Sequence, residues 1–124
     1  MHPIKEFYYR AYQVVFDLGS RVLPWRKPEV VGGAGSTEKI PELLRGCGVK
    51  KVLIVSGRHT GASLVPPIRA KIEAAGIAAV HFDGVRANPT IEIIEQVRDT
   101  YLAERCDGLL AVGGGSPMDT AKAA

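Results

Sequence analysis

A run of three glycines directly after a short apolar stretch constrains the fold of this chain more than any other feature. Residues 107–112 are predicted as a strand, and they lead straight into glycines 113–115, followed by Ser116 and Pro117. Glycines let the main chain approach a bulky ligand because no Cβ intervenes. Ser116 stands where an N-cap is favoured, and Pro117 stands at the first helical position. The pattern therefore predicts a helix N-terminus at the carboxyl end of a strand.

The segments before this turn alternate between strand and helix patterns. Residues 51–56 and 77–82 are short apolar runs, and the first is too apolar on both faces for an edge strand. Helices are predicted from Pro66 to about Ala75, which Gly76 ends, and from Thr90 to about residue 105. This order predicts an α/β fold, a Rossmann-like parallel sheet with crossover helices.

The N-terminal segment follows a different pattern. Between residues 3 and 22 apolar side chains recur at spacings of three and four, which predicts a helix with one buried stripe. The prolines of residues 23–28 exclude a continued helix and indicate a linker, and residues 29–32 are predicted as a short strand. We therefore divide the chain into a helix and linker, 1–28, and an α/β domain, 29–124, whose strand and helix order is typical of a nucleotide-binding half.

Composition limits the classes of protein to which the chain belongs. Hydrophobic residues at 46% and charged residues at 23% are values of a globular chain of 124 residues. The net charge is +3 with scattered basic residues, so we expect neither nucleic acid nor membrane as a partner. Cys47 and Cys106 have no CxxC partner and no neighbouring histidine, which fits a reducing, cytoplasmic setting.

The glycine turn has two interpretations at this point. A helix N-terminus binds phosphate through its free N–H groups and the positive end of its dipole. Alternatively, the turn is structural, because a strand-to-helix turn needs small residues and Ser116 with Asp119 is close to a capping box. The spacing matches neither the Walker pattern, since Lys122 comes too late, nor GxGxxG.

A second small-residue turn follows the first predicted strand at the same edge of the sheet. In dinucleotide-binding folds an acidic residue there accepts hydrogen bonds from the ribose hydroxyls of NAD, and an arginine accommodates a 2′-phosphate. Gly57 and Arg58 occupy this place. The alternative is a plain surface turn with a solvated arginine. The three histidines form no metal-binding pair.

Four segments together resemble the N-terminal domain of the iron-containing (group III) alcohol dehydrogenases. In order they are Gly33-Ala34-Gly35-Ser36, Val52-Leu53-Ile54-Val55, Asp83-Gly84-Val85 with Asn88-Pro89-Thr90, and Gly113-Gly114-Gly115-Ser116-Pro117-Met118-Asp119-Thr120-Ala121-Lys122. The match runs from about Val31 to Ala124. Their combination is far more specific than any one motif.

The resemblance implies an α/β domain that binds NADP or NAD, followed by an all-helical domain that holds a divalent metal, iron or zinc. The implied reaction is hydride transfer between an alcohol and an aldehyde or ketone. The implied cofactor-binding residues are Gly57, Arg58, Asn88, Gly113, Gly114, Gly115, Ser116 and Asp119. Relatives of the glycerol dehydrogenase and dehydroquinate synthase type, and a non-catalytic nucleotide-binding module, are the alternatives.

The sequence departs from the family's pattern in two places. Gly57 stands where the family often has an aspartate, so we expect NADP to be admitted, with Arg58 as a partner of its 2′-phosphate. The metal ligands of the family, an aspartate and three histidines, have no counterpart, and residues 119–124 lack a helix stop signal. We expect a fragment truncated at its C-terminal end and inactive by itself. A homodimer that pairs through the N-terminal part is also expected.

Overall fold

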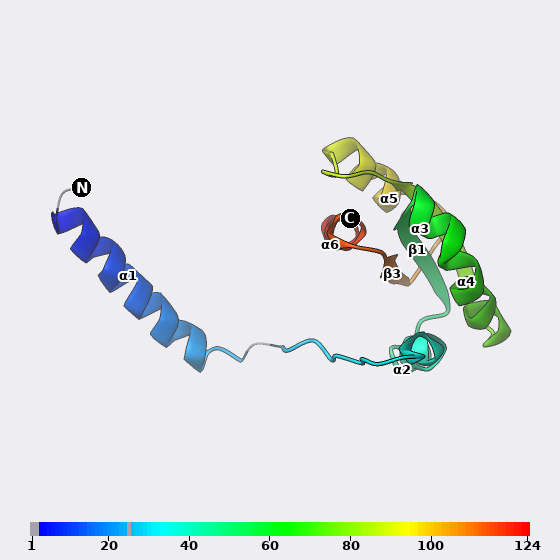
Figure 1. Cartoon of the computed structure of the whole chain (residues 1–124), viewed down its shortest axis with the longest axis horizontal. Coiled ribbons are helices and arrows are strands. Elements are labelled where there is room, and N and C mark those ends of the chain that lie inside the picture. The colour runs from blue at the N-terminus through cyan, green and yellow to red at the C-terminus, as the bar shows by residue number, and fades with distance from the viewer. Residues whose placement is uncertain (1–2, 25) are drawn as a thin grey trace. The chain divides into compact units, whose positions relative to one another are not determined.

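The computed structural model describes residues 3–24 and 26–124, which divide at Gly32/Gly33 into two compact units. The first contains helix α1 (Pro3–Val22), which confirms the predicted helix (Figure 1). The expected buried stripe is wrong: Phe7 is 76% exposed and Val15 is 70% exposed. The spacing of apolar residues predicts that one face of the helix favours burial, but it does not predict which element would cover that face. Among the described residues of this unit, α1 is the only regular element, so none of them packs on it as a second helix or strand.

The predicted strand at residues 29–32 does not form, and these residues have no regular secondary structure. A strand is stable only when its backbone groups pair with a neighbouring strand, and the three-stranded sheet of the described residues includes no strand from this segment. The second unit begins with a short 3-10 helix, η1 (Ser36–Lys39), and helix α2 (Ile40–Gly46), with Pro41 in its first turn.

Within the described residues the second unit is built on one sheet of three parallel strands. β1 (Lys51–Gly57) lies in the centre between β2 (Ala78–Val85) and β3 (Gly108–Val112), in the order β2-β1-β3. Both neighbours pair with β1 in parallel. The α/β fold with a parallel sheet is therefore confirmed, as is the buried position of the first predicted strand.

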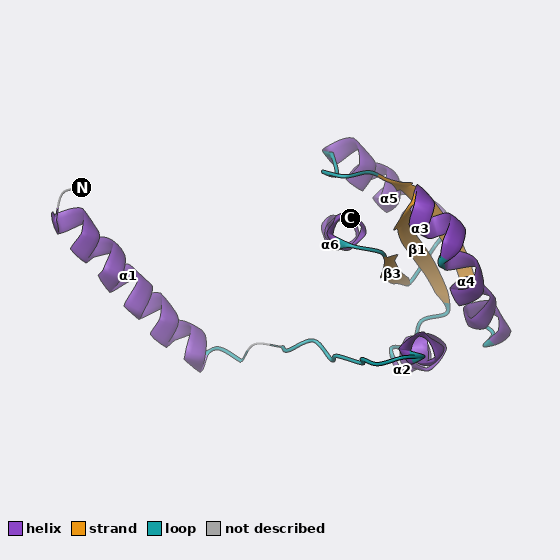
Figure 2. Cartoon of the chain, viewed as in Figure 1, coloured by secondary structure: helices purple, strands orange, loops and turns teal. Residues whose placement is uncertain are grey.

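Crossover helices connect the strands (Figure 2). After β1 come α3 (Arg58–Ser63) and α4 (Val65–Ala74), α5 (Ile91–Ala103) joins β2 to β3, and α6 (Gly115–Ala123) follows β3. Gly76 ends the α4 segment with a φ of 82°, a left-handed conformation that glycine adopts without steric cost. No helix in the described ranges is long and apolar enough to span a membrane.

The two faces of β1 bury separate clusters, because successive strand residues point to opposite sides. Val52 and Ile54 pack with Ile72 of α4, and α2 covers the edge of this cluster. Leu53 and Val55 pack on the other face, against α5 and α6. All four β1 side chains are 0% exposed. The helices after β1 therefore lie on one face of the sheet, and α5 and α6 lie on the other.

Asp107 fixes the start of β3 against the start of β1. Its carboxylate accepts hydrogen bonds from the backbone N–H groups of Lys50 and Lys51, at 2.8 to 3.0 Å. Its own N–H donates to the Lys51 carbonyl at 2.9 Å. The two backbone donors lower the pKa of Asp107. This anchor sets the register that brings the opposite ends of the strands together.

Candidate functional site

The carboxyl ends of the strands meet at one edge of the sheet. In the register of the ladder, Ser56 pairs with Val112 and Gly57 pairs with Val85. The turn after β3, the start of α3 and the segment after β2 therefore lie at the same edge. In open α/β sheets this edge is where ligands bind.

The connections from β1 and β3 leave toward opposite faces. The chain after β1 enters α3 and α4, which cover the face of Val52 and Ile54. The chain after β3 enters α6, whose Ala121 packs on the cluster of Leu53 and Val55. Two adjacent strands whose helices diverge in this way mark the topological switch point of an α/β sheet, where ligands bind, and we call the space at the ends of β1 and β3 the crevice.

The glycine turn forms the β3 side of this crevice. Gly114 is the N-cap of α6 in extended conformation, and Gly115 is the first helical residue. Ser116 and Pro117 therefore lie inside the first turn, so the predicted cap at Ser116 is wrong. The N–H groups of a first helical turn have no acceptor within the helix, so a proline, which lacks an N–H, is tolerated throughout this turn. The Ser116 carbonyl accepts a 2.7 Å hydrogen bond from the Thr120 hydroxyl.

The structural requirement for glycine differs among the three positions of the turn. Gly113 has a φ of 133°, and a Cβ there would lie 3.1 Å from Cγ of Pro117, so backbone geometry requires glycine. A Cβ on Gly114 or Gly115 would meet nothing within 4 Å. Packing within the chain therefore does not require glycine at these two positions, and the space beside them is open to a ligand. Asp119 lies one turn further along α6 and is exposed.

The β1 side of the crevice is the start of α3. Gly57 is the N-cap of α3, with φ −79° and ψ 165°, and a Cβ there would only touch the Val85 carbonyl at 3.4 Å. The predicted turn at 56–61 is therefore a short helix that starts at the exposed Arg58. A Cβ on Gly113 would lie 3.7 Å from Cγ2 of Thr60, so α3 adjoins the glycine turn.

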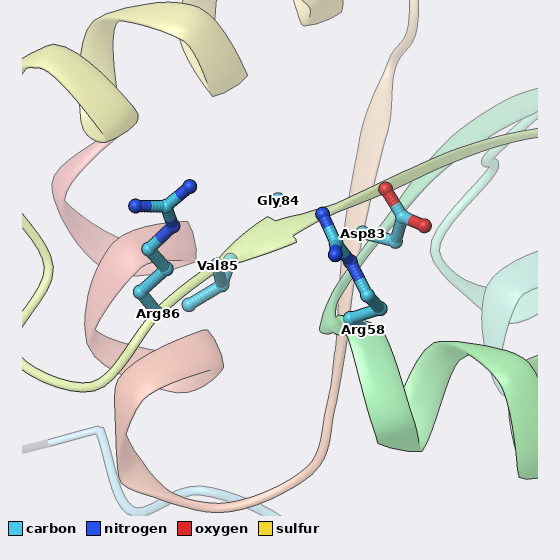
Figure 3. A pocket seen from close by; sticks show the side chains of 5 residues that line it. All are labelled: Arg58, Asp83, Gly84, Val85 and Arg86. Carbon is cyan, nitrogen blue, oxygen red and sulfur yellow. The ribbon is translucent and has the colours of Figure 1, made fainter.

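Two hollows follow the end of β2. The first has a volume of about 320 Å³ and is lined by Arg58, Asp83, Gly84, Val85 and Arg86 (Figure 3). The second, of about 420 Å³, shares Gly84 and Arg86 and extends past Asn88 to Thr90. Sequence reasoning assigned no role to Arg86. The signal that could have found it is its place shortly after the second predicted strand, residues 77–82, whose observed counterpart β2 ends at Val85, directly before Arg86.

Asn88 is held in an unusual backbone conformation. Its φ is 56°, in the left-handed region that asparagine tolerates better than most residues. Two residues later Thr90 is the N-cap of α5, and its side chain hydrogen-bonds the Glu92 carboxylate, which lowers the pKa of Glu92. Of the predicted residues, Asn88 therefore lines the second hollow, whereas Gly57 and Gly113 flank the crevice between β1 and β3.

A partly buried polar pair lies beneath α3. The Ser56 hydroxyl, 0% exposed, is 2.7 Å from Nε2 of His81 on β2. Burial lowers the pKa of His81; nearby Arg69 lowers it further and Asp83 opposes the shift. Gly61 of α3 covers this pair so closely that a Cβ would lie 2.7 Å from Oγ of Ser56. The pair therefore needs glycine above it.

No cluster of three or more His, Cys, Asp or Glu residues suited to a metal ion occurs in residues 3–24 and 26–124. Cys47 and Cys106 are free thiols, the first exposed and the second buried. The described part of the chain thus offers open backbone at its glycine turn, but no ligand set for a metal.

A family model and curated relatives both match most of this chain. The model of the iron-containing alcohol dehydrogenases matches residues 27–124. Choline dehydrogenase of Bacillus subtilis is 38% identical over 92 residues, which are 73% of this chain and 23% of that protein. Lactaldehyde reductase of Escherichia coli is 35% identical over 92 residues, 73% of this chain and 24% of that protein. The chain thus spans about a quarter of the length of these curated relatives.

Solved structures agree with the sequence relatives. An alcohol dehydrogenase from Oenococcus oeni superposes with a TM-score of 0.74 at 32% identity, covering 82% of this chain and 27% of that one. A 1,3-propanediol oxidoreductase gives a TM-score of 0.70 at 31% identity, covering 73% of this chain and 24% of the other. In both cases the similarity is to one part of a longer chain.

Proposed function

The chain belongs to the iron-containing alcohol dehydrogenase family, and we propose that it is the cofactor-binding part of an NAD(P)-dependent alcohol dehydrogenase. The parent enzyme would interconvert small alcohols and aldehydes or ketones by hydride transfer. The observation that carries the proposal is the open backbone at Gly114 and Gly115, at the N-terminus of α6, beside the crevice between β1 and β3. Glycines that the fold itself does not need indicate a ligand that approaches the main chain closely.

The proposed roles follow from the geometry. The free N–H groups of the first turn of α6, from Gly115 and Ser116, would bind the pyrophosphate. Gly57 would face the adenosine ribose, since its Cα lies at the carboxyl end of β1. When bound, the nicotinamide cofactor supplies the site that accepts or donates the hydride.

Three further residues complete the proposed site. Arg58 would contact a 2′-phosphate, and Asn88 would contact the cofactor from the loop that precedes α5. Asp119 would lie against it from the second turn of α6. We propose that NADP is used at least as well as NAD, because no carboxylate at position 57 repels a 2′-phosphate.

The metal of the family does not fit the described residues. None of their His, Cys, Asp or Glu side chains group in threes as a metal site requires. We therefore assign no metal-dependent step to this chain, and propose that iron or zinc in the parent enzyme is held by other residues. On this proposal the 124-residue chain binds a dinucleotide without turning over alcohol.

The setting and assembly are further proposals. The free thiols of Cys47 and Cys106 support a reducing, cytoplasmic compartment. The exposed apolar side chains of α1 support a homodimer that pairs through this helix.

The test is calorimetric titration of NADP and NAD into the chain and into Gly115→Val. The valine side chain would enter the space of the pyrophosphate, so binding should be lost while the circular dichroism spectrum and melting temperature stay close to those of the parent chain. Gly46→Val is the matched control, because a Cβ on this exposed glycine at the end of α2 also meets nothing within 4 Å.

Each outcome has a distinct meaning. Loss of binding in Gly115→Val, with binding retained in Gly46→Val, would support a dinucleotide site on the turn. Equal binding by both variants would place the ligand elsewhere. Absence of binding to the folded parent chain would contradict the proposal and favour a purely structural turn.

A further inference from the structure

A β-bulge shapes the hollow beside Gly57. Val55 pairs with Phe82 and Gly57 pairs with Val85, so the single residue Ser56 is opposed by two residues of β2, Asp83 and Gly84. A bulge of this kind bends the strand and changes the direction of its side chains, often next to a functional site. It returns Val85 to the core, where it is 7% exposed, and leaves the residues on either side at the surface.

Two arginines flank the bulge. Figure 3 shows Arg58, at the start of α3, and Arg86, just past the end of β2, on either side of Gly84. Both line the hollow of about 320 Å³, and neither forms an ion pair within the described part of the chain. Their charges are therefore available to an anion. A guanidinium presents a planar set of N–H donors that matches the oxygens of a phosphate.

Gly84 and Val85 form the wall of the hollow between the two arginines. A Cβ on Gly84 would lie 2.9 Å from the ring of Phe82, so this position excludes a side chain. Asp83 also lines the hollow and forms no ion pair in the described residues. The hollow thus combines two positive charges with one negative charge, and its net charge favours an anion. The volume is at the lower end of the range for small-molecule sites.

We propose that this hollow is the subsite for the 2′-phosphate of NADP, with Arg86 as a second cation opposite Arg58. The inference rests on the proposed dinucleotide site, which leaves the adenosine ribose beside Gly57. A 2′-phosphate carries nearly two negative charges at neutral pH, so two guanidinium groups stabilise it better than one. Asp83 opposes it by like charge and limits the preference for NADP over NAD.

The test compares NADPH and NADH binding, followed by nicotinamide fluorescence, in single variants of the chain. Arg86→Gln should weaken NADPH binding about tenfold, the effect of losing one charged hydrogen bond, with little change for NADH. Asp83→Asn should strengthen NADPH binding. Arg98→Gln, on the exposed surface of α5, is the matched control and should change neither. Raising the salt concentration should reduce the NADPH advantage.

A second probe separates the 2′-phosphate from the pyrophosphate. 2′-AMP and 5′-AMP carry one phosphate each, on different hydroxyls of the same nucleoside, and each is tested as a competitor of NADPH binding. The parent chain should prefer 2′-AMP, and Arg86→Gln should lose that preference.

The outcomes distinguish this inference from the proposed function. If dinucleotides bind and Gly115→Val abolishes binding, but Arg86→Gln leaves the NADPH to NADH ratio unchanged, the subsite is wrong and the proposed function stands. An equal loss of NADH and NADPH in Arg86→Gln would assign Arg86 to the shared pyrophosphate and would also overturn the subsite. Absence of binding of either dinucleotide to the folded chain would overturn both.

Discussion

Gly57 is a position at which one added side chain should shift cofactor preference toward NAD. Its extended backbone accepts any residue, and an added Cβ touches only the Val85 carbonyl at 3.4 Å, so Gly57→Asp should fold. The new carboxylate would accept hydrogen bonds from the ribose hydroxyls and repel a 2′-phosphate. We expect the ratio of NADP to NAD affinity to fall at least tenfold, an effect of about 1.4 kcal/mol, as measured by titration calorimetry.

Gly57→Asn is the control for this change. Asparagine has nearly the same shape without the charge, so it should lower NADP affinity much less. If aspartate and asparagine act equally, bulk and not charge decides, and the electrostatic account of Gly57 is wrong.

His81 should make stability depend on pH. Its ordinary pKa is 6.5, and burial beside Ser56 lowers the pKa in the folded state. The unfolded chain therefore binds a proton more readily, so the free energy of unfolding should fall as pH drops below 6.5 toward the folded-state pKa. Urea unfolding of the parent chain and of His81→Gln between about pH 8 and about pH 5 measures this. The parent chain should show the steeper fall, and parallel curves would contradict the prediction.

At the residue scale, local patterns locate glycines but not their neighbours in space. Gly57 and Gly113 are recognisable because each directly follows an apolar strand pattern. Arg86 is not, because its position opposite Arg58 depends on a bulge in β2, and no sequence pattern specified that two residues would oppose Ser56. Ser116 was misplaced as a cap because serine and proline are favourable at several positions of a first turn.

Among the elements, α3 depends most on one small residue. A Cβ on Gly61 would lie 2.7 Å from Oγ of Ser56 and 2.9 Å from Cε1 of His81, both on strands beneath the helix. Gly61→Ala should therefore destabilise the chain by about 1–3 kcal/mol through overpacking. This exceeds the gain of roughly 0.5–1 kcal/mol that alanine brings to a helix. Urea denaturation measures the difference.

Gly46→Ala is the matched control for this substitution. Gly46 is also helical, but a Cβ there meets nothing within 4 Å, so the helix preference for alanine acts alone. We expect this variant to be as stable as the parent chain or more stable. A Gly61→Ala variant that is equally stable would mean that α3 lies farther from the sheet than described.

Strands and long helices were predictable because their patterns are local. The apolar run that becomes β1 and the spacing that becomes α1 each predict an element without reference to neighbours. The short α3 was missed because six residues with several small side chains resemble a turn, and packing on Ser56 and His81 stabilises the helix. The strand expected at residues 29–32 fails for the converse reason, since local preference without a pairing partner is insufficient.

For the whole molecule, the sequence predicts a parallel sheet but not the order of its strands. β3 pairs with β1 and not with β2, which precedes it in the chain. That choice creates the crevice between β1 and β3, and it rests on long-range contacts such as Asp107 with the backbone of Lys50 and Lys51. The apolar spacing of α1 is likewise visible in the sequence, but it does not specify a surface that would cover this helix.

The exposed face of α1 leads to the last prediction, self-association of the chain. Phe7 and Val15 are eight residues apart and therefore lie on the same side of the helix, and both line one apolar hollow on its surface. Burying such a side chain against a second copy contributes about 1.5–3 kcal/mol, so Val15→Asp should raise the dimer dissociation constant about tenfold or more. Gln13→Asp, on the opposite side of α1, adds the same aspartate and should have little effect. Sedimentation velocity over a range of concentrations measures both, and a parent chain that stays monomeric throughout would contradict pairing through α1.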